Sequence, residues 1–428
     1  MKWCYKISAT VLTICCLLVT GCNSKEPEVA SSVPVEATEL GQTITVINPD
    51  STSNNAVRTQ PVSNGEKYQI QTRLTDFQLL SDTTGLAWGT TSGELRLYLT
   101  QDNGKTWTNI SPATAVQFPS NPEYGKEIFF KDSMNGWIVR NSIGASEAMI
   151  LRTRDGGGTW KLSSLRDSDE VAAMYFNDIE HGWILTVDNK AIDNQGKTLY
   201  LSEDGGATWS SIMSNQALPT TKKVDQVLPK SANFVSMIFT DQKNGYVSTM
   251  KSGLPALYVT EDGGMDWKEN TSFFNPAKYQ TCKQFTVGET TPFVNDQSTG
   301  WIPIGCSRDD GTKFNGYFTE DAGQSWQLVP FNLSWQTDLN EYSEPTFLNS
   351  KEGWTIQGDV VYRTIDQGNN WTPLPESPRL KNILQDYPEV VKLRFISSNV
   401  GWLLVAKTDQ KRSLLLQTQN GGVSWRVL

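Results

Sequence analysis

The sequence predicts an all-β protein built from seven copies of one unit, and three observations support this. A turn motif, S/T-x-D/N-x-G-x-x-W, occurs seven times along the 428 residues. A Gly-aromatic pair precedes each turn motif by 12 to 21 residues, in a looser form ("TGLAW") in the first copy. Short apolar runs such as 172–176 come before the pairs. Self-similarity at a period of about 50 residues indicates a repeat architecture.

The turn motif is predicted to hold the chain in shape. Its Asp or Asn should accept hydrogen bonds from backbone N–H groups one or two residues ahead, and a glycine such as Gly206 should supply a positive φ. Its Trp should pack between sheets, so we favour a structural role over calcium or ligand binding. The polar positions are Asp102, Asp155, Asp204, Asp262, Asp321, Asp366 and Asn420, and the tryptophans are Trp107, Trp160, Trp209, Trp267, Trp326, Trp371 and Trp425.

Each copy contains four strand-like pieces. In the third copy these are strand A over 172–176, strand B over 182–187, strand C over 198–202 and strand D from Thr208. A four-stranded meander that needs neighbours on both sides is the blade of a β-propeller. The sequence therefore predicts a seven-bladed β-propeller over residues 68–428, with antiparallel blades and the turn motif between strands C and D.

The turn "LYLSEDGGATW", ending at Trp209, resembles the Asp-box, or BNR repeat. This repeat is found in sialidases, sortilin-type receptors, some endoglucanases and the photosystem II stability/assembly factors. Seven blades with a "GW" strand and an Asp-box turn are most similar to the last family and to exported bacterial proteins related to it. The resemblance implies the propeller fold strongly and a function only weakly, because one fold hosts many activities.

The N-terminus reads as a bacterial lipoprotein signal. Lys2 and Lys6 precede an apolar stretch over 7–19, and "LVTGC" places small residues before Cys22. We expect a signal peptide over 1–21, a lipid on Cys22 and a flexible tether over 22–67. An ordinary secretory signal and an uncleaved anchor are the alternatives, and all three export the chain to the extracytoplasmic side of a membrane.

Composition narrows the possible partners. Loss of residues 1–21 removes two lysines and no acid, which changes the formal charge from −9 to −11. A chain this acidic is a poor candidate for nucleic-acid binding. We find no metal-ligand spacing and no cofactor motif, so neither a metal nor a cofactor is expected.

The loops from D to A and from B to C should share one face of the propeller, here called the loop face. The A to B turns and the Asp-boxes should form the opposite face, the box face. Cys282 and Cys306 both fall on the loop face of the fifth blade, and a disulfide is the default for two thiols in an exported protein. Aromatic and charged side chains in the same loops form the candidate binding face, namely Phe274, Tyr279, Arg308, Phe314, Trp335 and Tyr342.

The sequence favours a membrane-anchored, monomeric protein-binding or complex-assembly module in a bacterial envelope, and not an enzyme. The alternative is a carbohydrate-active enzyme, sialidase-like or endoglucanase-like, or a lectin. The sialidase "RIP" signature is absent from the sequence. Paired carboxylates in an open central cleft would favour the enzyme, because glycoside hydrolysis uses two carboxyl groups.

Overall fold

The structure is a computed structural model that describes residues 42–47, 67–112, 118, 121–141, 147–166, 168–216, 226–293, 296–337 and 344–428. These residues fall in one compact unit, Glu39–Leu428. The predicted signal peptide, Cys22 and Tyr342 lie outside the described residues. Within the described part, no helix is long and apolar enough to cross a membrane.

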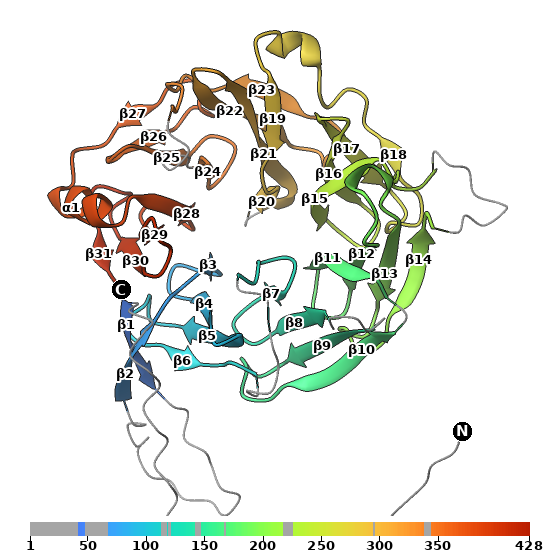
Figure 1. Cartoon of the computed structure of the whole chain (residues 1–428), viewed down its shortest axis with the longest axis horizontal. Helices are drawn as coiled ribbons and strands as arrows, with labels where there is room; N and C mark the ends of the chain where they lie inside the picture. The colour runs from blue at the N-terminus through green and yellow to red at the C-terminus, as the bar shows by residue number, and fades with distance from the viewer. Residues whose placement is uncertain are drawn as a thin grey trace, which may run out of the picture. The chain divides into compact units, whose positions relative to one another are not determined.

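Seven antiparallel sheets lie around a central axis, which confirms the predicted seven-bladed β-propeller (Figure 1). Each blade uses consecutive strands, with strand A innermost. Blade 1 consists of β3 (Asp76–Leu79), β4 (Gly85–Thr91), β5 (Glu94–Thr100) and β6 (Thr108–Asn109). Blade 2 consists of β7 (Ile128–Phe130), β8 (Gly136–Asn141), β9 (Glu147–Thr153) and β10 (Lys161–Arg166). Blade 3 consists of β11 (Glu170–Phe176), β12 (Gly182–Val187), β13 (Lys197–Ser202) and β14 (Ser210–Ser214).

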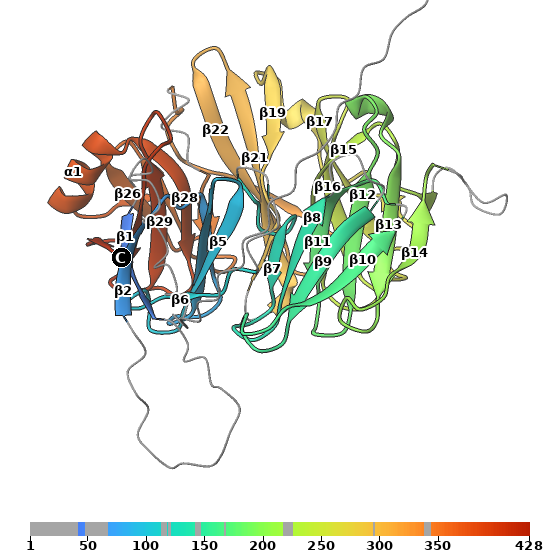
Figure 2. The ribbon, with the colours of Figure 1, turned by 60° about the horizontal axis from the view of Figure 1, so that its bottom comes forward.

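Blade 5 differs from the others because a further strand, β19 (Gln284–Val287), pairs with its strand B. Blade 4 consists of β15 (Ala232–Phe239), β16 (Gly245–Lys251), β17 (Leu254–Thr260) and β18 (Lys268–Glu269), and blade 5 of β20 (Thr291–Phe293), β21 (Asp296–Arg308), β22 (Gly311–Thr319) and β23 (Gln327–Pro330). Blade 6 consists of β24 (Thr346–Phe347), β25 (Gly353–Gln357), β26 (Val360–Thr364) and β27 (Thr372–Pro373). Blade 7 consists of β28 (Glu389–Phe395), β29 (Gly401–Ala406), β30 (Ser413–Thr418) and β31 (Arg426–Val427). The hairpin of β21 and β22 stands above the neighbouring blades (Figure 2).

Short helices occur in the connections, among them η1 (Ile192–Asn194), η3 (Pro276–Tyr279) and α1 (Pro378–Asp386). Outside the blades, β1 (Gln42–Ile47) pairs antiparallel with β2 (Lys67–Thr72). This pair contacts β6 and β30, next to the junction of blades 1 and 7. The predicted tether over 22–67 therefore contains a paired strand.

The ring closes by packing of blade 7 against blade 1, without exchange of a strand between the described sheets. The backbone N–H of Leu74 donates to Ser413 Oγ at 2.9 Å. The buried ring of Trp402 lies 5.7 Å from the rings of both Phe77 and Trp107.

The "GW" pair is a packing device between blades. In blade 3, a Cβ on Gly182 would lie 2.2 Å from the ring of Phe176, so only glycine fits beside that ring. Trp137 of the preceding blade stacks on the other side of Phe176, with ring centroids 3.6 Å apart. The same arrangement recurs where Trp183 stacks on Phe239 and Trp354 on Phe395, each at 3.8 Å.

The Asp-box is closed by its own side chains, as predicted, but the donors differ from the expectation. Asp204 Oδ1 accepts from the N–H groups of Ala207 and Thr208, three and four residues ahead, at 2.9 and 2.8 Å. Gly205 and Gly206 both have positive φ, 67° and 85°, which curls the chain back over the carboxylate. The prediction of donors one or two residues ahead was therefore wrong.

One backbone hydrogen bond ties the Asp-box to the A to B turn in every blade. The N–H that follows the Asp or Asn donates to a carbonyl just before the Gly-aromatic pair, at 2.7 to 2.9 Å. The donor and acceptor residues are Asn103 and Thr83, Gly156 and Met134, Gly205 and Glu180, Gly263 and Lys243, Ala322 and Ser298, Gln367 and Lys351, and Gly421 and Asn399. The two sequence motifs are thus the two halves of one turn structure on the box face.

The looser motif of blade 1 has a different geometry. Leu86 holds the position that Trp137 and Trp183 hold in their blades, and Trp88 lies two residues further along β4. Trp137 and Trp183 donate to Asp-box carbonyls of the next blade, at 2.9 Å each. Trp88 instead donates to the carbonyl of Pro122 in the loop that enters blade 2, at 2.8 Å.

Candidate functional site

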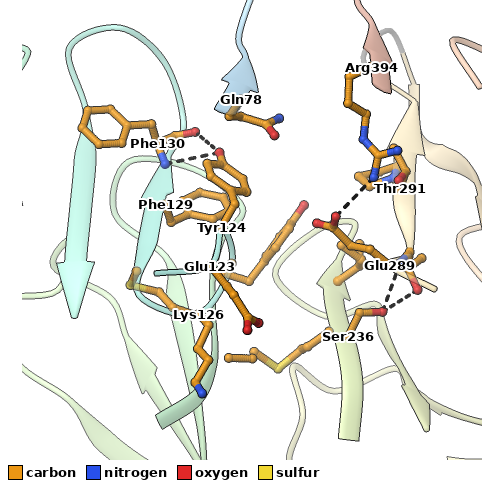
Figure 3. Close-up of a pocket in the computed structure, with 18 of the residues that line it drawn as sticks. Gln78, Glu123, Tyr124, Lys126, Phe129, Phe130, Ser236, Glu289, Thr291 and Arg394 are labelled. Atoms are coloured by element: carbon orange, nitrogen blue, oxygen red, sulfur yellow. Dashed lines mark hydrogen bonds and ion pairs between the residues drawn. The ribbon is translucent and has the colours of Figure 1, made fainter. Parts of the chain in front are cut away.

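The inner strands of all seven blades enclose a central pocket of about 500 Å³ (Figure 3). This volume lies within the range of ligand pockets in proteins. Because strand A of each blade runs from the loop face to the box face, residues ahead of these strands mark the loop-face end of the pocket. Residues at the A to B turns mark the box-face end.

Aromatic side chains form one wall of the pocket. Tyr124 and Phe129 stack with centroids 5.5 Å apart, and Phe129 packs edge-on against Tyr175 at 5.4 Å. The Tyr124 hydroxyl donates to the carbonyl of Phe130 at 2.7 Å. The side chain of Tyr175 is about nine-tenths buried, and its hydroxyl has no hydrogen-bond partner among the described residues. Burial raises the pKa of Tyr175, so its hydroxyl stays protonated at neutral pH.

The opposite wall is polar. Arg394 Nη2 and Glu289 Oε2 form an ion pair at 3.3 Å, and Figure 3 shows both side chains across the pocket from Tyr124. The Thr290 N–H donates to Ser236 Oγ at 3.3 Å, which joins blade 5 to blade 4. The Glu123 side chain projects into the pocket in Figure 3 and makes no ion pair with the described residues.

Further charges lie beside the loop-face end of the pocket. Asp76 pairs with Lys392 at 2.9 Å, and Lys126 pairs with Glu170 at 3.4 Å. Burial raises the pKa of Asp76 although Lys392 opposes the shift. Burial, with a smaller contribution from Glu289, also raises the pKa of Glu344. Several carboxyl groups therefore lie near one another at this end of the pocket.

The box-face end is bridged by a single amide. In its hydrogen-bonding orientation, Gln297 of β21 donates to the carbonyl of Thr240 at 3.0 Å and to Asn177 Oδ1 at 2.9 Å, and it accepts from Lys131 Nζ at 3.1 Å. These partners come from blades 2, 3 and 4. Gln297 thus ties four blades together where the pocket approaches the box face.

The sequence-predicted binding face is partly interior. Tyr279 stacks on Phe274 at 5.2 Å, and its hydroxyl donates to Tyr317 Oη at 3.1 Å. Phe314 is 1% exposed. Tyr279 and Phe314 are therefore buried in the protein's own hydrophobic clusters.

Arg308, at the end of β21 in the protruding hairpin, is brought against Trp335 of the segment that follows β23. The guanidinium carbon of Arg308 lies 3.6 Å from the centroid of the Trp335 ring, and Arg308 Nε donates to Asp310 at 2.8 Å. Cys306 lies near the turn of this hairpin, paired with Lys313, and Cys282 lies just ahead of β19. Their sulfur atoms are at bonding distance and their Cα atoms are 5.4 Å apart. Tyr342, the sixth predicted residue, lies outside the described residues.

Sequence reasoning missed most of the central pocket. Glu123, Glu289 and Arg394 carry no shared motif, and they meet only because three blades converge on one axis. The available signal was their position in or just ahead of a predicted strand A. Among the described residues, no three His, Cys, Asp or Glu side chains form a group that could hold a metal ion.

Comparisons with known proteins agree with the fold. Residues 95–243 match the family model described as sortilin, neurotensin receptor 3. The chain is 23% identical over 357 residues to the chloroplastic photosystem II stability/assembly factor HCF136 of Guillardia theta, with 71% of this chain and 82% of that protein covered. It is 22% identical over 296 residues to the photosystem II assembly protein Ycf48 of Synechococcus sp. (strain JA-2-3B'a(2-13)), with 63% and 79% covered.

A solved structure gives the same result for the fold. YCF48 from Cyanidioschyzon merolae superposes with a TM-score of 0.50 at 17% identity, covering 81% of this chain and 95% of that chain. The sequence motifs, the seven blades and these likenesses agree. The chain is a seven-bladed Asp-box β-propeller similar to the photosystem II stability/assembly factors.

Proposed function

We propose that this protein is a monomeric protein-binding or assembly module of a bacterial cell envelope. In this proposal a lipid on Cys22 holds the propeller on the extracytoplasmic side of a membrane. The names of the relatives support an assembly role, since HCF136 and Ycf48 are both called photosystem II assembly proteins. The partner of this chain would be a protein at the membrane surface.

The observation that carries the proposal is the central pocket together with the loops around it. An opening of about 500 Å³ with an aromatic wall and a charged wall is suited to a short protein segment. The protruding hairpin with Arg308, together with Trp335 beside it, would form the rim of the binding surface, because Arg and Trp are enriched among the residues that dominate protein affinity. Phe274, Tyr279, Phe314 and Tyr342 would support this rim.

Affinity capture tests the proposed partner surface. The tagged full chain would be incubated with membranes of its own host, and captured proteins would be quantified by mass spectrometry. An Arg308→Ala/Trp335→Ala variant should lose the specific partner, whereas Arg379→Ala, at an exposed position of α1, should retain it. Equal capture by both variants would rule out the hairpin as the partner surface.

Two further experiments test the anchor and the disulfide. Labelling of cells with a radioactive fatty acid should mark the wild-type chain and leave Cys22→Ser unmarked. Mass spectrometry of the exported, unreduced protein should find one peptide linking Cys282 to Cys306, whose Cα atoms lie 5.4 Å apart. Two free thiols would refute the disulfide.

A carbohydrate-active enzyme is the second candidate function, and the carboxylates in the central pocket favour it. Glu123 and Glu289 both line the pocket, and glycoside hydrolysis requires two carboxyl groups on either side of a bond. We expect the purified chain to release no sugar from sialosides or β-glucans. Release that is abolished in Glu123→Gln and Glu289→Gln would favour the enzyme instead.

A further inference from the structure

We infer that the central pocket binds the cationic side chain of a lysine or arginine in an extended segment of a partner protein. This inference rests on the proposed function and adds the chemistry of the segment that is bound. Four features of the pocket support it: the unequal ends, the excess of carboxylates, the unpaired hydroxyl of Tyr175 and the partners that the pocket's own cations already have.

The two ends of the pocket differ in access. At the box-face end, the Gln297 amide links Lys131, Asn177 and Thr240. At the loop-face end, Glu123 is exposed, and Glu289 has a side chain that is 49% exposed. A segment would therefore enter from the loop face, where the long loops lie.

The loop-face end carries more negative than positive charge. The charged groups around this end come from the inner strands or their entry loops, and they are Asp76, Glu123, Glu127, Glu170, Glu289 and Glu344 against Lys126, Lys392 and Arg394. Of these, Glu123, Glu289, Lys126 and Arg394 line the pocket itself. Six carboxyl groups thus lie around this end against three cations, with Lys131 as a fourth cation at the box-face end. Burial raises the pKa of Asp76, Glu127 and Glu344, so the negative charge is carried mainly by Glu123, Glu170 and Glu289 and by the Asp76 that pairs with Lys392. A low-dielectric opening with such an excess attracts a cation.

The aromatic wall suits a long, partly apolar cation. Lysine and arginine place a hydrocarbon stem against apolar surface while the charged head keeps polar contacts. Tyr124 and Phe129 line this wall and offer apolar ring surface against which the stem can pack. The Tyr175 hydroxyl, which has no partner among the described residues, could accept a hydrogen bond from the ammonium or guanidinium group.

An anionic ligand fits less well because the cations of the pocket already have partners. Arg394 is paired with Glu289, and Lys126 is paired with Glu170 and lies 3.7 Å from Glu127. Lys131 lies at the far end, bonded to Gln297. An anion would have to displace these carboxylates from Arg394 and Lys126, or the Gln297 amide from Lys131. A cation instead meets the carboxylate of Glu123, which makes no ion pair with the described residues.

Binding of short peptides to the purified full chain tests the inference. The probes are acetyl-GLKLG-amide, the matched acetyl-GLELG-amide and n-butylamine, and dissociation constants would be measured by ligand-observed NMR at low salt. The lysine peptide should bind at least tenfold more tightly than the other two probes. Glu123→Gln should weaken it by about tenfold, because the amide keeps the shape of the side chain and loses the charge-assisted hydrogen bond to the ammonium group. Tyr175→Phe should weaken it by about threefold, as expected for a neutral hydrogen bond.

The control is Glu203→Gln, the same substitution in the exposed Asp-box of blade 3 on the box face, which should change nothing. Equal binding of the two peptides, equal binding of n-butylamine, or no effect of Glu123→Gln with an unchanged melting temperature would overturn the inference. The capture experiment separates this result from the proposed function. If Glu123→Gln captures the membrane partner as wild type does and no lysine peptide binds, the proposed function survives and this inference fails.

Discussion

At the residue scale, one position of the Asp-box sets a conformational cost that differs between blades. The residue after the Asp or Asn has a positive φ in every copy, and it is glycine in four of them. In the others it is Asn103, Ala322 or Gln367, with φ of 60°, 58° and 65°. For residues other than glycine, this left-handed conformation costs about 1 kcal/mol of conformational free energy. Asn tolerates it best, because its short side chain can hydrogen-bond locally.

Replacement of Gln367 by glycine should therefore stabilise the protein. We expect Gln367→Gly to raise the free energy of unfolding by about 1 kcal/mol, measured by chemical denaturation. Gln324 of blade 5 is a matched control, since it lies in the same motif but does not have a positive φ. Gln324→Gly should lower stability, and a gain at both positions would contradict the explanation by φ.

The carboxylate of the Asp-box is also a residue-scale feature. Blade 7 has an amide, Asn420, in its place, so the hydrogen bonds of the two groups can be compared. Asn420 Oδ1 accepts from the Ser424 N–H at 2.9 Å, as Asp204 Oδ1 accepts from the Thr208 N–H at 2.8 Å. In blade 3 the second oxygen accepts the Thr208 hydroxyl at 2.7 Å. In blade 7 the Asn420 amide donates to the Ser424 hydroxyl instead.

An amide should therefore replace the acid at little cost. Asp204→Asn should change the free energy of unfolding by less than about 0.5 kcal/mol, because a hydroxyl can either donate or accept. Asp204→Ala should cost about 1 to 2 kcal/mol, since the backbone N–H groups lose their acceptor. Thermal denaturation of both variants checks this, and equal losses would show that charge, rather than hydrogen bonding, holds the turn.

At the element scale, a Phe at the end of strand A packs between a glycine of its own blade and a Trp of the preceding blade in blades 3, 4 and 7. Phe176 ends β11, packs on Gly182 of its own blade and receives Trp137 from the preceding blade. The stack at 3.6 Å and the indole hydrogen bond to Gly205 act at the same blade junction. Glycine in the "GW" pair is therefore required by space, since its Cβ would meet a ring that cannot move away from two neighbours.

A methyl group at Gly182 should disrupt this junction. Gly182→Ala would place a Cβ 2.2 Å from Phe176, and overpacking of this kind costs about 2 to 3 kcal/mol. Gly253→Ala is the control, because its Cβ would meet nothing within 4 Å and only its φ of 78° would be strained. Urea denaturation should show a clearly larger loss for Gly182→Ala, and similar losses would argue against the steric explanation.

At the scale of the whole molecule, the repeated residues predicted the fold, and the unrepeated ones form the candidate site. The Asp-boxes and "GW" pairs could be recognised in sequence because each works within one blade or between adjacent blades. The position of Trp88 could not, because the first motif is shifted by two residues. Glu123 and Arg394, from blades 2 and 7, line one pocket only because the ring closes on itself. Such proximity follows from ring closure and has no local sequence pattern.

The buried Lys197 provides the last prediction, which concerns global stability above neutral pH. Lys197 is 1% exposed, and its Nζ donates to the carbonyls of Gln195 and Pro229 at 3.2 and 3.1 Å, where β13 meets the loop into blade 4. Burial lowers its pKa from 10.5 to about 8. Between these values the unfolded chain binds more protons than the folded chain, so stability should rise with pH from about 8 towards 10. The full gain is about 3 kcal/mol, at about 1.4 kcal/mol per pKa unit.

Above about pH 10 the gain is opposed, because burial raises the pKa of Tyr175 and the unfolded state then releases more tyrosine protons. Melting temperatures from pH 7 to 11 should therefore pass through a maximum, and Lys197→Met should remove the rise whatever its effect on stability at pH 7. The control is Lys190→Met, at an exposed side chain paired with Asp188, and in this variant the melting temperature should still rise between pH 8 and 10. A wild-type melting temperature that stays constant over this range would show that the surroundings of Lys197 do not disfavour its charge.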